Sequence, residues 1–224
     1  MRLIRRALPL RRARRLVGRI ARDCGGSSVI ELAFAMPIVM MMGLGLSELA
    51  AFAIAQTRIN QVAISVADNA SRAKQSVRFG SPQMREFDVN ETFEAAQLQF
   101  PGMDLASDGR VVLSSLETNA TGGQWIHWQR CFGNSSLGGS QYGPQGTGAS
   151  GNGFPGMGPP SSRITTETNA AIMFAEVTYR YRPLFFDYFM GTQTIRKSAA
   201  MYVRDDRDLT QLYNPDPAAP VSSC

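Results

Sequence analysis

The longest apolar run in the chain lies near its N-terminus, from Val29 to Ala55. Only Glu31, Ser47 and Glu48 interrupt it with strongly polar side chains. About 20 helical residues cross the hydrocarbon core of a bilayer, so a run of this length can span it with some tilt. A helix in a soluble core is usually shorter and keeps a polar face, which this run lacks. The pattern therefore predicts one membrane-spanning helix over residues 27–55.

A narrower apolar seam continues beyond this run, with its members four and three residues apart. They are Ile59, Ala63, Val66, Ala70, Ala73 and Val77. This spacing predicts that the helix continues to about Val77 and ends before Ser81-Pro82. The seam could pack on the chain's own sheet or on a partner helix, and its small residues favour the chain's own sheet.

The rest of the chain predicts a short helix and a small antiparallel sheet. Asn90 can cap a helix over 91–99, which Pro101-Gly102 then stops. Runs of alternating apolar and polar residues predict strands over 110–117, 124–130, 170–183 and 192–204. The fold class that follows is α+β, with a long N-terminal helix, membrane-spanning in its first half, packed on a small antiparallel sheet.

Alternation also assigns side chains to the two faces of the sheet. In the third predicted strand, Phe174 and Glu176 face one side, whereas Met173 and its alternate neighbours face the other. In the second strand, Ile126 and Trp128 are expected to share a face. The apolar stretch 184–190 between the last two strands is expected to form a short helix or a turn.

Residues 133–162 have a different composition, with 10 glycines, 4 prolines and almost no charge. Such a segment is not expected to build a core, so the sequence predicts a flexible Gly-rich loop inserted between strands. A loop displayed to binding partners is the alternative. No Gly-Lys-Ser/Thr sequence closes it, which excludes a phosphate-binding loop.

Charge sets the direction of the predicted span. Residues 1–26 hold nine arginines and one acid, Asp23, so this leader carries a charge of +8. The positive-inside rule places the leader in the cytoplasm and residues 56–224 on the opposite side as an exported domain. From Ser27 onward there are 14 bases and 17 acids. The high isoelectric point therefore belongs to the leader, and no nucleic-acid partner is indicated.

Two targeting segments compete with this interpretation. A secretory signal peptide could be cut after a small-residue site at 51–53, but its apolar region should be only about 7–15 residues long. An organellar transit peptide is Arg-rich, as the leader is, but it is also Ser-rich, and the leader has no serine before Ser27. A membrane anchor fits the pattern better than either.

Candidate chemistry is sparse. His127 is the single histidine, and no Ser/Asp set near it in the sequence marks it as a catalyst rather than a surface strand residue. The three cysteines lack the spacing of a metal site. No catalytic residue, metal or cofactor is predicted. Cys131 and Cys224 are a disulfide candidate, because both lie in the exported part, where an oxidising compartment permits a bridge.

The switch from charged to apolar sequence carries the motif GGSSVIELAFAMP, from Gly25 to Pro37. Glu31 is the fifth residue after Gly26. This resembles the processing site of type IV prepilins, which implies that a prepilin peptidase cuts between Gly26 and Ser27. A carboxylate inside the bilayer costs about 2.5–3.5 kcal/mol, so Glu31 needs a partner. The resemblance implies that it pairs with the new α-amino group of a neighbouring subunit and sets the register of assembly.

The region from Met40 to Arg72 resembles the TadE-like pilus-assembly family. The residues that carry the resemblance are Glu31, Pro37, Gly45, Glu48, Leu49, Gln56, Asn60, Ala63, Ala70 and Arg72. Leu32 and Ala50 depart from the family pattern, which has an aromatic residue and a glycine there. The resemblance implies a minor pseudopilin of a Tad/Flp-type pilus or related secretion machine. The implied location is the bacterial inner membrane, with the C-terminal domain in the periplasm. The implied partners are the membrane, the prepilin peptidase, other pilins or pseudopilins and the assembly platform.

Several alternatives stay open at this point. Glu31 could lie at the cytoplasmic boundary with its carboxylate reaching water, and Gly25-Gly26 could be a linker. Glu48 is expected near the outer interface and exposed to water, with a buried contact to a partner helix as the alternative. Pro37 is expected to kink the helix. The chain could also be an unprocessed, single-pass periplasmic anchor that binds envelope partners.

Overall fold

A computed structural model describes residues 18, 25–75, 80–99, 101–185 and 191–224. The chain divides into two compact units, Met1–Leu49 and Ala50–Cys224, called here the N-terminal and the C-terminal unit. Almost all of the expected leader, residues 1–26, lies outside the described residues, as does most of the apolar stretch 184–190.

Helix α2 runs from Gly25 to Arg72. The sequence-based end at about Val77 is wrong, because Ala73 and Lys74 are no longer helical and Gln75 pairs with Gln83 in an isolated bridge. A side chain from far along the chain covers this helix end. Arg207 donates from Nη1 to the carbonyls of Ala70 (2.9 Å) and Ala73 (2.6 Å), which satisfies acceptors that a helix end leaves open.

The C-terminal unit contains a four-stranded antiparallel sheet in the order β3-β2-β4-β5. The strands are β2 (Gly109–Thr118), β3 (Gln124–Gly133), β4 (Ile172–Tyr181) and β5 (Gln193–Tyr202). All four match the runs expected from alternation to within a few residues at each end. The α+β class with a long helix against a small antiparallel sheet is therefore confirmed.

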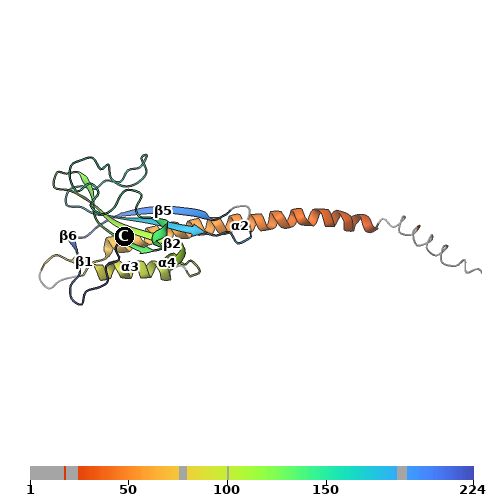
Figure 1. Ribbon diagram of the computed structural model, residues 1–224, viewed down its shortest axis with the longest axis horizontal. Coiled ribbons are helices and arrows are strands. Elements are labelled where there is room, and N and C mark those ends of the chain that lie inside the picture. The colour runs from red at the N-terminus through yellow and green to blue at the C-terminus, as the bar shows by residue number, and fades with distance from the viewer. Residues whose placement is uncertain (1–17, 19–24, 76–79, 100, 186–190) are drawn as a thin grey trace, which may run out of the picture. The chain divides into compact units, whose positions relative to one another are not determined.

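Smaller elements complete the unit. They are β1 (Gln83–Arg85), α3 (Glu86–Leu98), α4 (Leu105–Asp108), η1 (Ser135–Leu137) and β6 (Asp208–Tyr213). Strands β1 and β6 pair in parallel as a separate two-stranded sheet, which the sequence did not predict. In Figure 1, α3 and the C-terminal part of α2 lie along the four-stranded sheet, and β1 and β6 lie at one end of it.

The two faces of the sheet carry different cores. On one face, the second half of α2 and α3 pack on alternate residues of the strands, including Val111, Leu113, Met173 and Val177. On the other face, a smaller cluster gathers Leu116, Ile126, Met157, Ile172 and Phe174. The expected alternation along β4 is confirmed, since Met173 and Phe174 fall in different clusters.

A β-bulge overturns one expectation about β3. Ser115 pairs with Trp128 and Leu116 pairs with Ile126, so His127 has no partner of its own in the register. The extra residue reverses the alternation on one side of it. As a result, Ile126 joins the smaller cluster and Trp128 joins the larger one. The expectation that these two residues share a face is wrong.

Helix α3 begins five residues earlier than expected, at Glu86 rather than Glu91. Its first turn is closed by Asp88, whose Oδ2 accepts the backbone N–H of Arg85 at 2.9 Å and whose carboxylate pairs with the Arg85 guanidinium. Asn90, expected as the cap, instead lies inside the helix. It donates to the carbonyl of Pro220 and accepts from the hydroxyl of Ser222, so it holds the C-terminal tail.

The Gly-rich segment 133–162 is packed rather than open, so the expectation that it builds no core is wrong. Met157 is fully buried in the smaller cluster, with Tyr142 and Phe154 packed against it. The segment is also fastened through its backbone, since the Ile126 N–H donates to the Thr147 carbonyl at 2.8 Å. Gly148 has φ +80°, and a Cβ there would lie 2.3 Å from the Gln124 carbonyl oxygen. Its missing side chain permits this close approach.

Candidate membrane helix and assembly site

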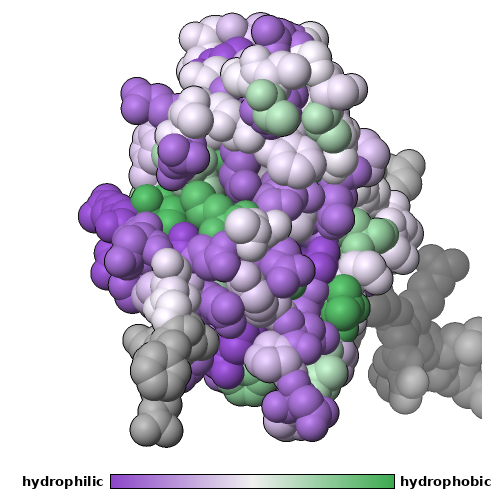
Figure 2. Space-filling model, turned by 90° about the vertical axis from the view of Figure 1, so that its left-hand side faces the viewer, coloured by the Kyte–Doolittle hydropathy of each residue, from purple (hydrophilic) through white to green (hydrophobic). Residues whose placement is uncertain are grey.

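The first part of α2 presents apolar side chains on all sides. Between Val29 and Leu49 its large apolar residues are each at least 37% exposed. They are Val29, Ile30, Leu32, Phe34, Met36, Ile38, Val39, Met40, Met41, Met42, Leu44, Leu46 and Leu49. Figure 2 shows the face of the C-terminal unit at the β1 and β6 end, which is mainly hydrophilic with small separate apolar areas. The helix is long and apolar enough to cross a membrane.

The candidate cleavage residues lie in the first turn of this helix. Gly26 and Ser27 are both helical, and Glu31 lies on the exposed surface. Residues four apart on a helix share a face and lie about one turn from each other. Ser27 and Glu31 are four apart, so an amino group created on Ser27 would arise on the same face as the Glu31 carboxylate.

Pro37 lies inside α2, which is continuous on both sides of it. Proline has no N–H, so the carbonyl of Ala33 lacks its usual helical donor. Ser47, in contrast, adds hydrogen bonds to the helix. Its hydroxyl donates back to the carbonyls of Gly43 and Leu44, each at 2.9 Å, and so satisfies its polarity within the helix.

Glu48 is buried, with only 1% of its surface exposed. The expectation of a water-exposed carboxylate near the outer interface is therefore wrong. Among the three polar residues of the apolar run, Glu31 and Ser47 are exposed and Glu48 is buried.

The bulge in β3 brings His127 to two partners that the sequence analysis missed. His127 Nδ1 lies 2.8 Å from Glu117 Oε2, and the Ser115 hydroxyl donates to Glu117 Oε1 at 2.6 Å. Trp125 stacks on the imidazole with ring centroids 4.4 Å apart. In a nucleophilic triad the serine would donate to the histidine. Here it donates to the carboxylate, so the arrangement orients His127 but does not activate Ser115.

Within the described residues no group of three or more His, Cys, Asp or Glu side chains is placed to hold a metal ion. Cys131 and Cys224 form a disulfide, with their Cα atoms 4.9 Å apart and a sequence separation of 93. Beside the bridge, the Cys131 N–H donates to the Ser222 carbonyl at 2.8 Å. The tail therefore runs along the outer edge of β3 and is fixed there covalently.

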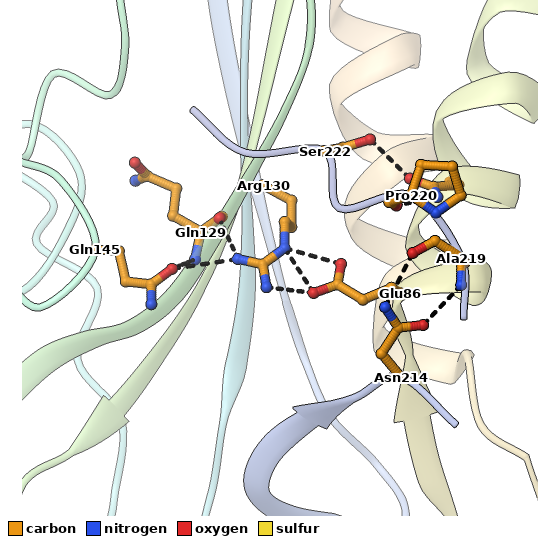
Figure 3. A network of polar contacts seen from close by, with 9 residues as sticks. Glu86, Gln129, Arg130, Gln145, Asn214, Ala219, Pro220 and Ser222 are labelled. Carbon is orange, nitrogen blue, oxygen red and sulfur yellow. Dashed lines mark hydrogen bonds and ion pairs between the residues drawn. The ribbon is translucent and has the colours of Figure 1, made fainter. Parts of the chain in front are cut away.

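A buried ion pair next to this tail is the second feature that the sequence did not show. Arg130 of β3 meets Glu86 of α3, and Nε lies 2.8 Å from Oε2 (Figure 3). Gln145, from the Gly-rich segment, accepts from Arg130 Nη1 at 3.2 Å and from the Gln129 N–H at 3.1 Å. The pair therefore joins the helix, the edge strand and the loop. Its members are 44 residues apart, so no local pattern could have linked them.

Burial perturbs two further charged groups. Desolvation raises the pKa of Glu176, whose Oε1 accepts the Gln141 N–H at 3.0 Å. Desolvation also lowers the pKa of Arg207, the residue that covers the end of α2. Both groups have clear structural partners within the C-terminal unit. Their perturbation reflects packing rather than a catalytic centre.

Comparisons with protein-family models, with curated proteins and with solved structures find no match. The fold and the helix define the class on their own. The chain is an α+β protein whose long N-terminal helix first exposes an apolar surface of membrane-spanning length and then contributes to the core of the C-terminal unit.

Proposed function

We propose that the chain is a minor pseudopilin that acts in assembly of a Tad/Flp-type pilus or a related secretion machine. The observation that carries the proposal is the division of α2. Its first half exposes large apolar side chains behind the Gly26-Ser27 junction, and its second half forms the spine of a folded unit. A pseudopilin uses one helix first to stay in the membrane and later to pack in a filament. It therefore needs an apolar half for the membrane and a second half that carries the folded unit.

The leader supplies the direction. Nine arginines on residues 1–26 hold the N-terminus in the cytoplasm of a bacterial inner membrane, and the C-terminal unit then faces the periplasm. The disulfide between Cys131 and Cys224 suits that oxidising compartment. Loss of the leader would remove a charge of +8 that would otherwise have to cross the bilayer if the helix were drawn out toward the periplasm.

Glu31 has two possible partners after a cut between Gly26 and Ser27. One is the new amino group of its own Ser27, which shares its helix face. The other is the amino group of a neighbouring pilin or pseudopilin. Exchange of the first for the second on assembly would keep the carboxylate paired in both states, and it would select the register in which a neighbour can dock.

The direct test is the mass of the protein isolated from its native membrane. The wild-type protein is expected to have the mass of residues Ser27–Cys224. The Gly26→Leu variant is expected to have the mass of the uncut chain, because a bulky residue blocks the close approach of the peptidase that glycine permits. Gly18→Leu changes another glycine before the junction and is the matched control, expected to be cut normally. A wild-type N-terminus at Met1 would contradict the proposal and favour an unprocessed periplasmic anchor.

Assembly is tested separately with Glu31→Gln. This variant is expected to be cut but absent from sheared surface filaments, since an amide cannot form the ion pair that sets register. Glu91→Gln, an exposed carboxylate on α3, is the control and should assemble as wild type. Normal assembly of Glu31→Gln would remove the register role from this residue.

A further inference from the structure

A cleft opens where α2 enters the C-terminal unit. It holds about 360 Å³ and is lined by Ala51, Ile54 and Arg58 of α2, by Arg180 and Arg182 at the end of β4, and by residues around Met103. The end of β4 packs against the helix here, because the rings of Tyr181 and Phe52 make a T-shaped contact with centroids 5.3 Å apart. The cleft therefore lies beside a packed contact between α2 and β4.

The charged lining is predominantly basic. Three arginines and one acid, Asp108, line the cleft. Arg182 pairs with Asp108 at 2.8 Å, and 66% of the arginine side chain remains exposed. Arg58 and Arg180 add two further guanidinium groups. One guanidinium group can donate two parallel N–H bonds to the oxygens of a phosphate. Three guanidinium groups around one cleft therefore suit a phosphate better than a neutral ligand.

Exposed apolar side chains also belong to this region: Ile54 and Leu184 line the cleft, and Phe185 follows Leu184 in the sequence. Leu184 is 68% exposed, Phe185 is 56% exposed, and Ile54 on α2 is 54% exposed. Ile54 follows the apolar surface of the N-terminal unit by only five residues, about 8 Å along a helix. Apolar side chains next to arginines, immediately beyond an apolar span, are typical of residues at the boundary between headgroups and acyl chains.

We propose that this cleft binds the phosphate headgroup of an anionic phospholipid, with Leu184 and Phe185 entering the outer part of the acyl layer. The proposal rests on the membrane position given above and adds a contact that the spanning helix alone does not provide. A second anchor of this kind holds the C-terminal unit against the bilayer surface in one orientation. Drawing the subunit out of the membrane then requires release of the lipid as well as of the helix.

Depth-dependent quenching tests the apolar part. The full chain with Phe185→Trp is reconstituted in vesicles of phosphatidylcholine and phosphatidylglycerol whose acyl chains carry bromine near the headgroup. We expect strong quenching of the new tryptophan. Phe87→Trp is the control. Phe87 is exposed and lies at the start of α3, a helix about 20 Å long that does not line the cleft, so this tryptophan is expected to stay unquenched. Equal and weak quenching of both would overturn the proposal.

The charged part is tested by the lipid that stays bound to the full chain in detergent, measured by native mass spectrometry. Arg58→Gln with Arg180→Gln is expected to lower the retention of phosphatidylglycerol over phosphatidylcholine by about tenfold or more, since each interfacial arginine is worth about fivefold. Arg163→Gln with Arg204→Gln removes two exposed arginines outside the cleft and keeps the leader, so it should match wild type. Equal loss in both pairs would overturn the proposal.

Failure of the membrane position itself looks different. In that case the wild-type chain would not float with the vesicles, and both this proposal and the pseudopilin proposal would fall. A chain that floats, but whose Phe185→Trp variant is unquenched, would overturn only the lipid contact.

Discussion

The two halves of α2 share one secondary structure and differ in what surrounds them. From Val29 to Leu49 the large apolar side chains are exposed on every side. From Ala50 to Arg72 the buried side chains follow one face, and Ile59, Val62 and Val66 are fully enclosed by the C-terminal unit. A helix with no polar face has no stable arrangement in water, whereas a helix with one apolar face needs a core to cover it. The first half of the continuous helix α2 thus suits an apolar environment, and its second half suits the core of a folded unit in water.

The largest effect should come from a charge on the covered face. Val62→Asp places an unpaired carboxylate in the larger core and is expected to destabilise the C-terminal unit by more than about 4 kcal/mol. Urea unfolding of the full chain in detergent, followed by the fluorescence of Trp125 and Trp128, measures the change. Gln61→Asp, on the exposed side of the same turn, is the control and should be close to neutral. In the first half, Val39→Asp should leave the urea midpoint unchanged and instead reduce membrane insertion.

Loss of the disulfide should have the next largest effect. Cys224→Ser is expected to lower the free energy of unfolding by about 2–5 kcal/mol, because the bridge closes a long loop and holds the tail on β3. The same urea titration reports it. Cys24→Ser removes a cysteine that precedes α2 and serves as the control. Equal midpoints for Cys224→Ser and wild type would mean that the tail adds nothing to stability.

The buried core and the exposed apolar surface of α2 can also be compared through the same substitution, methionine to alanine. Met157→Ala, in the fully buried centre of the smaller cluster, is expected to cost about 2–4 kcal/mol through lost burial and the cavity left behind. Met41→Ala, on the exposed apolar surface of α2, should leave the unfolding of the C-terminal unit unchanged. If the two variants unfolded alike, the Gly-rich segment would not be part of the cooperative unit.

The smallest effect concerns pH. Burial raises the pKa of Glu176 above its usual value of 4.5 in the folded chain, so the native state holds a proton more tightly than the unfolded state. Stability should therefore fall as pH rises from about 4.5 through the raised pKa, and recover on acidification. Glu176→Gln keeps an acceptor for the Gln141 N–H and removes the titration. Urea midpoints across this pH window should be flatter for Glu176→Gln than for wild type, whereas equal slopes would contradict the assignment.

Local patterns were sufficient for the regular elements. Period-two alternation located β2 to β5, and the seam of small apolar residues located the face of α2 that the core covers. These signals are local, because each element shows its own buried face in its own sequence. The apolar half of α2 was equally clear, since its length and its high content of apolar residues are also properties of the segment alone.

The remaining features depend on residues far apart in the chain. The bulge at His127 is a property of the pairing between β2 and β3, and Arg207 reaches the end of α2 across 137 residues. The Gly-rich segment was misjudged because composition says little about a loop fastened by backbone hydrogen bonds and a few apolar anchors such as Met157. Glycine here serves close approach rather than freedom of movement.

The fastening of the tail also decides where the sheet can grow. An outer strand normally offers unpaired backbone groups to any extended segment that approaches it. On the β3 side, the Ser222 carbonyl already accepts the Cys131 N–H, and the adjacent sulfur bridge keeps that segment from leaving. Among the described strands, β5 pairs only with β4. Recruitment of a further strand, from another copy or another protein, is therefore directed to the β5 border.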